Sequence, residues 1–299
     1  MPSPRTSFLK LLLPGFILAM AGMGMAQSLP KVSATGTAAS SKGSSGLIIP
    51  RVNSPTMPRL GYAKYPWKTD IVATVFWVGE QPTENNPTPN NMSSWDTEWE
   101  KNFGGYDDPD PNNRGPNYCP RGFIPRLNPF YIALPYNDCL DYNSHKSEAS
   151  KVIPWFREKF VRGGKSVLHG TWLAIRYGNR VCYAQWEDCG PFVTDDHAYV
   201  FGNARPKNTS NKGAGLDISP AVRDYLGMSS SGKCDWRFVD VSEVPPGPWR
   251  SIGTNNHFVR SQQLQKANDA TSTAARIAEL KRMRDEYFKQ NGNAAYQNR

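Results

Sequence analysis

Proline and glycine interrupt this chain so often that little room is left for long regular elements. Its 299 residues include 25 prolines and 25 glycines, and both residue types end helices and strands. The β-branched and aromatic runs between them are short, as at residues 71–78 and 130–134, which is typical of buried strands. We therefore expect a mainly β, loop-rich fold with one principal domain.

The N-terminal part of the chain predicts an exported protein. Arg5 and Lys10 precede an apolar run over residues 11–20, and small residues follow up to Ala26, which is the pattern of a secretory signal peptide cleaved after Ala26. The run is too short and too rich in glycine for a stable membrane span. Residues 27–56 are mostly small or polar, so we expect a flexible linker there. The mature protein is then expected in the periplasm or outside the cell.

Charge and cysteine content narrow the classes of partner and cofactor. The formal net charge of +9 suits either an acidic glycan partner or a solvated basic surface without a partner, and no nucleic-acid motif is present. The five cysteines of an exported chain predict disulfides, but their spacing does not assign the pairs. No CxxC pair exists, and the run Asp107–Asn113 lacks the glycine and glutamate of a calcium loop. We expect no metal and no cofactor.

The pattern of apolar residues predicts short elements. Strands are expected over residues 71–78, 130–134, 171–177, 180–186 and 236–241. Gly178-Asn179 is suited to a hairpin turn between two of these strands. A helix is predicted over residues 148–161, with Pro154 tolerated in its first turn.

Two further helical signals are local. Ser219 as N-cap and Pro220 as first helical residue predict a short helix that ends at Gly227. Trp95 and Trp99 stand at i, i+4 spacing, which indicates a stripe that faces the core. Both signals therefore predict short helical segments within the β domain.

The chain beyond residue 258 has a different character. Ile277, Leu280, Met283 and Tyr287 recur at helical spacing among Arg and Lys, which predicts an amphipathic helix outside the β domain. Docking on the domain, pairing with a second copy and contact with a membrane surface all remain open. The predicted organisation is a signal peptide over residues 1–26, a linker over 27–56, a β domain over 57–258 and a helical tail over 259–299.

Two segments combine a carboxylate with a glycine or a helix start. Residues 186–191 read Trp-Glu-Asp-Cys-Gly-Pro, and residues 213–220 read Gly-Ala-Gly-Leu-Asp-Ile-Ser-Pro. Each segment places an aspartate, Asp188 or Asp217, at the end of a predicted strand. Asp217 also precedes the short helix, whose free amides stabilise negative charge. A carboxylate in such a position suits either a structural cap or a catalyst.

The order of these motifs resembles the double-psi β-barrel of rare lipoprotein A, in which Asp-Arg-Gly-Pro is followed by Ile-Asp-Leu-Ser. The chain is also similar to expansins, to barwin-like endoglucanases and to the three-Asp domain of membrane-bound lytic transglycosylase A. The segment Ala133–Asp138 is a looser version of the Ala-x-Asp strand in that last group. The resemblance covers residues 130–241 and implies a six-stranded double-psi β-barrel with long inserted loops and a short helix.

The resemblance also implies roles for three aspartates. Asp217 corresponds to the general acid of the endoglucanases and to the acid/base of the transglycosylases. Asp188 corresponds to the middle aspartate, which supports the site, and Asp138 to the first one, the general base of a hydrolase. Cleavage of a glycosidic bond needs a proton for the leaving oxygen, and an inverting hydrolase adds a second carboxylate about 6.5 to 9.5 Å away. An acid that works near neutral pH needs a raised pKa, which burial or a neighbouring carboxylate supplies.

Four other residues are candidates for substrate binding. Asp196 and His197 lie in a loop longer than in compact barrels of this kind and are candidates to line an enlarged cleft, although polar loops contain such residues without any function. Tyr136 and Trp186 are candidates to stack on sugar rings, with a place in the core as the alternative for Trp186.

The function that we expect is cleavage of a polysaccharide, either of peptidoglycan by a lytic transglycosylase or of another β-linked glycan by a hydrolase. One alternative is a non-catalytic, expansin-like glycan-binding module, and another is a structural or inhibitory exported protein. An enzyme requires Asp217 in an open cleft beside a second carboxylate. A binding module requires a shallow aromatic strip instead, and a structural protein would bury all three aspartates.

Overall fold

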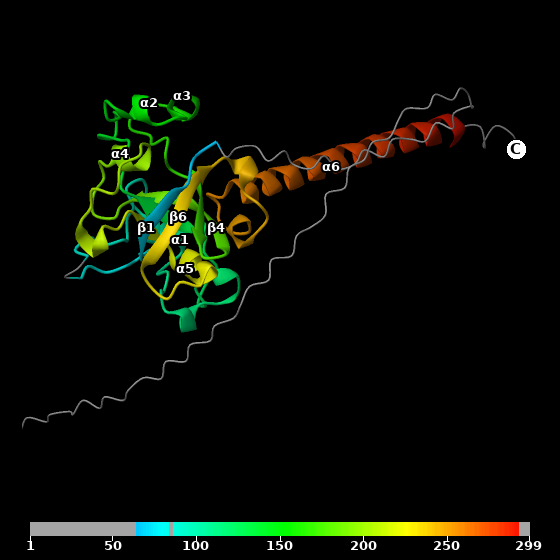
Figure 1. Cartoon of the computed structure of the whole chain (residues 1–299). Helices are drawn as coiled ribbons and strands as arrows, with labels where there is room; N and C mark the ends of the chain where they lie inside the picture. Colours follow the sequence, from blue (N-terminus) through cyan, green and yellow to red (C-terminus); the bar gives the residue numbers. More distant parts are fainter. Residues whose placement is uncertain (1–63, 84–85, 293–299) are drawn as a thin grey trace, which may run out of the picture. The chain divides into compact units, whose positions relative to one another are not determined.

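A closed β-barrel forms the centre of the molecule. The computed structural model describes residues 64–83 and 86–292, and the predicted signal peptide and linker lie outside them. Six strands close in the order β1-β5-β2-β4-β3-β6, and β1, β4 and β6 are labelled in Figure 1. They are β1 (Lys68–Val75), β2 (Tyr131–Leu134), β3 (Trp172–Tyr177), β4 (Arg180–Cys189), β5 (Leu216–Ile218) and β6 (Gly232–Val239). The mainly β fold and the six-stranded barrel are thereby confirmed.

The barrel mixes parallel and antiparallel neighbours. β1 pairs with β5, and β2 with β4, in parallel, whereas the other four neighbouring pairs are antiparallel. Parallel neighbours cannot be joined by a tight turn and need a crossover. Long connections leave the barrel after β1, β2 and β4, and those after β1 and β4 line the site described below.

The helices lie in the connections and after the last strand. They are α1 (Trp99–Phe103), α2 (Ala149–Val152), α3 (Phe156–Lys159), α4 (His197–Val200), α5 (Pro220–Leu226) and α6 (His257–Gly292). Five short 3₁₀ turns complete the fold: Pro111–Asn113, Pro116–Tyr118, Ser210–Lys212, Val241–Glu243 and Pro248–Arg250. Among residues 64–83 and 86–292, no helix is both long enough and apolar enough to span a membrane.

The helix predicted over residues 148–161 is wrong as a single element. α2 ends at Val152 and α3 begins at Phe156, and between them Ile153 is extended, with φ −86° and ψ 114°. A residue before proline is pushed out of the helical region by the proline ring. Pro154 therefore separates two one-turn helices and does not sit in the first turn of one longer helix.

The signals for the short helix and for the hairpin are confirmed. Ser219 accepts a hydrogen bond from the Val222 amide, Pro220 is the first residue of α5, and Gly227 ends it with φ 73°. A left-handed residue at this position favours glycine. In the hairpin, β3 and β4 pair up to Tyr177 opposite Arg180, so the turn contains the two predicted residues.

A second apolar cluster lies outside the barrel interior and explains why β1 ends early. The sequence predicts a strand up to Val78, but β1 ends at Val75. Phe76 and Val78 pack instead with Trp99 and Phe103 of α1, against Tyr131 and Ala133 of β2. Trp99 and Tyr131 meet edge to face, with ring centroids 5.2 Å apart. This packing holds the connection between β1 and β2 beside the end of the barrel.

A register shift in β4 turns an aspartate out of the core. Ile132 of β2 pairs with Trp186 of β4, but the next residue of β2, Ala133, pairs with Asp188. Glu187 is therefore the extra residue of a bulge. In a regular strand Asp188 would share the face of Trp186, which points into the core. The bulge places Asp188 on the opposite face, beside Ala133.

Candidate functional site

A cavity of about 1110 Å³ opens at the end of the barrel where β1, β4 and β5 carry their polar residues. Its walls come from the ends of these strands, from the connections after β1 and β4, and from the segment before β6. The described residues that line it include Thr74, Phe76, Trp77, Glu80, 86–90, 92–94, 108–110, Ala133, 188–192, Thr194, Asn211, Asp217, Arg223 and 229–231. The volume lies slightly above the range of about 300 to 1,000 Å³ that is typical of small-molecule sites.

Four residues form one row across neighbouring strands at the floor of this cavity. Thr74 of β1 pairs with Asp217 of β5, Asp217 pairs with Ala133 of β2, and Ala133 pairs with Asp188 of β4. Residues that pair directly lie on the same face of a sheet. Since Ala133 carries the side chain between them in the row, only a methyl group stands between Asp217 and Asp188 there.

The surroundings of Asp217 suit a general acid, which must be protonated near neutral pH. Its side chain is partly buried, between Leu216 and Ile218, which point into the core. Burial, with smaller contributions from the nearby Asp188 and Glu80, raises the pKa of Asp217 to about 7, against a hydrogen bond that Thr74 Oγ1 donates to Asp217 Oδ1. This carboxyl is therefore protonated in an appreciable fraction of molecules at neutral pH.

Gly190 lets the Asp217 carboxyl lie against the loop after β4. A Cβ atom built on Gly190 would stand 3.2 Å from Asp217 Oδ2 and 3.9 Å from the Ala133 Cβ. Within the described part of the chain, no hydrogen bond engages Oδ2. The Gly-Pro pair of the sequence motif therefore leaves room for the oxygen that can carry the proton.

Asp188 is held more firmly than Asp217. Its Oδ1 accepts hydrogen bonds from the backbone amides of Ser94, at 2.7 Å, and Cys189, at 2.8 Å. Burial raises the pKa of Asp188 to about 6, and the two amides oppose this shift. Near neutral pH Asp188 is therefore mostly ionised, while Asp217 is partly protonated, so the pair can serve as base and acid.

Glu80 is a third acidic group in the cavity, and sequence reasoning did not single it out. Its side chain is buried, and Oε2 accepts a hydrogen bond of 2.8 Å from Asn90 Nδ2. Burial raises the pKa of Glu80. The residue follows the first predicted strand by only two positions, but nothing in the local sequence indicates that the connection turns it back toward Asp217.

The cavity is acidic although the chain as a whole is basic. Five acidic residues line it among the described residues: Glu80, Asp108, Asp110, Asp188 and Asp217. Arg223 is the single basic residue in the same lining, and it is ion-paired with Asp224 at 2.7 Å. Such a surface favours a neutral or cationic ligand over an anionic one.

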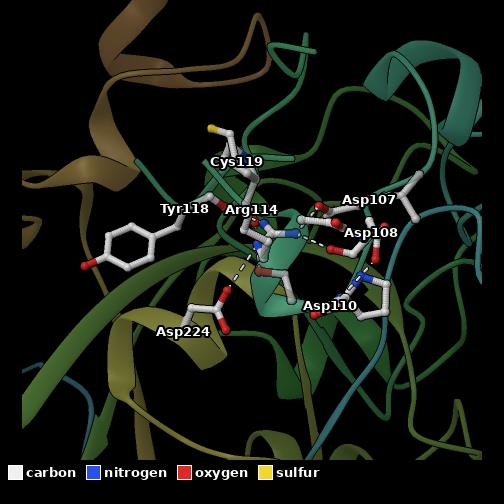
Figure 2. Close-up of polar contacts among 12 residues, drawn as sticks. Asp107, Asp108, Asp110, Arg114, Tyr118, Cys119 and Asp224 are labelled. Carbon is white, nitrogen blue, oxygen red and sulfur yellow. Dashed lines mark hydrogen bonds and ion pairs between the residues drawn. The ribbon is translucent and has the colours of Figure 1, made fainter. Parts of the chain in front are cut away.

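A buried ion-pair network supports the wall that carries Asp108 and Asp110 (Figure 2). The Arg114 guanidinium contacts Asp107 at 2.7 Å and Asp224 of α5 at 3.1 Å, with its side chain 3% exposed. The same group donates a hydrogen bond of 2.8 Å to the Asp108 carbonyl oxygen. Arg114 therefore joins the connection between β1 and β2 to α5.

The structure places Asp138 outside the cavity. The Asp138 side chain is fully buried and accepts hydrogen bonds from Ser166 Oγ at 2.5 Å and from the Val167 amide at 2.8 Å. These contacts tie the loop after β2 together. Of the three aspartates that the motifs suggest, Asp188 and Asp217 come together, and Asp138 does not join them.

None of the four predicted substrate-binding residues lies among the residues that line the cavity. Tyr136 is buried and donates a hydrogen bond to Glu148, and Trp186 is buried in the core and stacks on Phe238. Asp196 is buried as the N-cap of α4, and His197 begins that helix. Aromatic and polar surface near Asp217 comes instead from Phe76, Trp77 and Phe192, and from the 86–94 segment.

The five cysteines are free thiols in this structure. Cys119, Cys182 and Cys234 are buried, and Cys139 and Cys189 are partly buried. Burial raises the pKa of Cys119 to about 11 and that of Cys234 to about 12. Cys119 and Cys234 therefore have the character of structural residues and not of nucleophiles.

The comparison with known proteins found no relative of this chain. The chain matches no protein-family model and no curated protein. What the fold and the site define is a class: a closed six-stranded β-barrel with a partly buried carboxylate pair at the floor of an acidic cavity.

Proposed function

We propose that this chain is a secreted protein with a double-psi β-barrel, which cleaves glycosidic bonds in peptidoglycan or another β-linked polysaccharide and uses Asp217 as general acid. The observation that carries the proposal is the position of Asp217 in the cavity with a pKa of about 7, beside the mostly ionised Asp188. The six strands, with their two parallel pairs, agree with the double-psi topology that the motifs suggest.

The chemistry assigns a task to each group. The Asp217 carboxyl protonates the leaving oxygen as the glycosidic bond breaks, and Thr74 holds the other carboxyl oxygen in place. The ionised Asp188 stabilises the positive charge that develops on the sugar ring. In a hydrolase Asp188 also takes a proton from the attacking water, whereas in a lytic transglycosylase a hydroxyl of the sugar itself attacks.

The separation of the two carboxyl groups decides from which side the sugar is attacked. Asp217 and Asp188 lie on strands that flank β2, and two strand spacings amount to about 9.5 Å between backbones. An inverting hydrolase separates its carboxyl groups by about 6.5 to 9.5 Å, whereas a retaining one holds them about 5 to 5.5 Å apart. A carboxyl separation in the longer range leaves room for a water or an internal hydroxyl, whereas one near 5 Å suits a covalent sugar intermediate.

The acidic cavity also restricts the substrate. Five carboxyl groups and a single, already paired arginine favour neutral sugars or amino sugars in the positions next to the scissile bond. The positive charge of the whole chain then acts at a distance, by attracting the protein to an anionic wall.

The proposal is tested by incubating the mature protein with purified peptidoglycan and with β-glucans, and by analysing the soluble products by mass spectrometry. Anhydro-muropeptides indicate a lytic transglycosylase, and products with ordinary reducing ends indicate a hydrolase. We expect Asp217→Asn to abolish release, and Asp195→Asn, which changes an exposed loop aspartate, to leave it unchanged. Glycan binding without release, equal in wild type and Asp217→Asn, would contradict catalysis and favour the binding-module interpretation.

A further inference from the structure

Three potential metal ligands meet in the loop after β2, outside the cavity. They are Asp138, Cys139 and His145, and one donor atom of each lies within 4.8 Å of the other two. Asp138 is fully buried and the His145 side chain is 7% exposed. No residue of this group belongs to the cavity lining, so the site is independent of the proposed catalytic residues.

The distances match those between ligands on one metal ion. Cys139 Sγ lies 3.7 Å from Asp138 Oδ1, and His145 Nε2 lies 3.5 Å from Asp138 Oδ2. Around a tetrahedral zinc ion, with Zn–S of about 2.3 Å and Zn–N or Zn–O of about 2.0 Å, donor atoms lie roughly 3.3 to 3.5 Å apart. Both distances to Asp138 therefore lie within a few tenths of an ångström of this range, and the three donor atoms lie within 4.8 Å of one another.

The surrounding residues hold these ligands in place. Ser166 and Val167 each donate a hydrogen bond to a different oxygen of Asp138, which orients the carboxylate and leaves each oxygen a further lone pair. The His145 ring packs edge-on against Phe156, with centroids 5.1 Å apart. Such contacts around the ligands are what a metal site needs to bind without rearrangement.

The backbone brings Cys139 and His145 together as the base of a small hairpin. The two residues form an isolated β-bridge, and the Leu140 amide donates to the Ser144 carbonyl oxygen at 3.1 Å. Gly163 and Gly164 pack directly on the same hairpin, since a Cβ on either would lie 2.0 Å or less from backbone atoms of Tyr142 or Asn143. The site thus joins three segments of a long connection whose helices, α2 and α3, have four residues each.

We infer that Asp138, Cys139 and His145 bind a zinc ion that clamps the loop between β2 and β3. Thiolate, imidazole and carboxylate are all zinc ligands, and a thiolate excludes magnesium and calcium. Binding forms bonds to Sγ, to Nε2 and to one carboxylate oxygen, and it releases the Cys139 thiol proton to solvent. The Lys165 carbonyl oxygen, 3.0 Å from Nε2, or a water completes the fourth position.

The test uses Co²⁺, whose spectrum reports thiolate ligands and four-coordinate geometry. The full chain is reduced with a phosphine, stripped with a chelator and titrated. We expect saturation at about one Co²⁺ per chain, with a thiolate charge-transfer band, and displacement by Zn²⁺. Cys139→Ser removes that band and His145→Gln weakens binding by about tenfold or more, whereas the controls Cys119→Ser and His169→Gln change neither.

A second measurement needs no variant and therefore does not depend on how a variant folds. Zn²⁺ that binds the native chain raises the midpoint of thermal unfolding, and a chelator reverses the shift. A wild-type chain without a saturable Co²⁺ spectrum, or with a band that persists in Cys139→Ser, would overturn the inference. An unfolding midpoint that Zn²⁺ leaves unchanged would overturn it as well.

Discussion

Three neighbours of Asp217, namely Thr74, Asp188 and Glu80, shift its pKa in addition to burial. Each of them can be changed by one substitution. Burial accounts for most of the rise to about 7, Asp188 and Glu80 add to it as like charges, and the Thr74 hydroxyl opposes it. A hydrogen bond to the ionised form lowers a carboxyl pKa, and a nearby negative charge raises it. The two kinds of neighbour should therefore move the pKa in opposite directions.

Glu80→Gln should lower the pKa of Asp217, because it removes a negative charge and keeps an acceptor for Asn90. Thr74→Val should raise it, because it removes the donated hydrogen bond. Both shifts are measurable by NMR titration of labelled aspartate, without any substrate. If the chain cleaves glycans, the alkaline limb of kcat/KM against pH should move with the pKa in each variant. Equal shifts in the same direction would contradict this account.

Asp217 should also make the stability of the protein depend on pH. Its pKa is raised from 3.8 to about 7 on folding, so the folded state binds more protons than the unfolded state between these values, and the free energy of unfolding falls as pH rises through this range. Asp217→Asn lacks this effect. Relative to the wild type, the free energy of unfolding of the variant should rise by on the order of 1 kcal/mol between pH 4 and pH 8, after a discount for the partial exposure of Asp217. Urea unfolding at the two pH values measures it, and parallel pH dependences would contradict it.

At the scale of elements, α5 and the connection between β1 and β2 depend on one another through Arg114. Its guanidinium is buried between Asp107 and Asp224, and Tyr131 also donates a hydrogen bond to Asp107 at 2.8 Å. The neighbouring Arg223 donates to the Pro109 carbonyl oxygen at 2.7 Å. Charged groups therefore attach the part of the cavity wall around Asp108 and Asp110 to α5.

Arg114→Met should destabilise the protein by about 3 to 5 kcal/mol, because the buried Asp107 loses its ion-pair partner and Asp224 keeps only Arg223. Arg282→Ala is a matched control, since Arg282 is 66% exposed and its pairs lie on the surface of α6, where loss costs less than about 1 kcal/mol. Urea unfolding followed by circular dichroism measures both variants. A similar small effect in the two variants would mean that the Arg114 network contributes little.

At the scale of the whole molecule, α6 is largely independent of the barrel. Phe258 in its first turn packs on Trp172, and Arg250 lies over the Phe258 ring at 3.8 Å. Further along, Ile277, Leu280 and Met283 are about half exposed. The predicted helix is present, but beyond Phe258 its apolar residues Ile277, Leu280 and Met283 stay exposed.

Deletion of residues 264–299 should therefore change the free energy of barrel unfolding by less than about 0.5 kcal/mol. Phe258→Ala in the full chain should cost about 1 to 2 kcal/mol, because it removes buried aromatic area. All nine tryptophans lie before α6, so tryptophan fluorescence during urea unfolding reports the barrel alone. A large loss of stability on deletion would show that α6 supports the barrel.

Local chemistry in the sequence determined several features of this protein. Ser219, Pro220 and Gly227 specify α5, Gly178-Asn179 specifies the β3–β4 turn, and the β-branched runs specify strands. Cap, turn and strand preferences are properties of a few neighbouring residues, so they can be read without the fold. The same motifs pointed to Asp188 and Asp217 as neighbours.

Tertiary structure alone decided which side chains surround Asp217. The bulge at Glu187 turns Asp188 out of the core, and the packing of Phe76 against α1 brings Glu80 back toward the site. It also places Asp138 outside the cavity and Trp186 inside the core. These positions depend on strand register and on contacts between residues far apart in the chain, which no local pattern encodes.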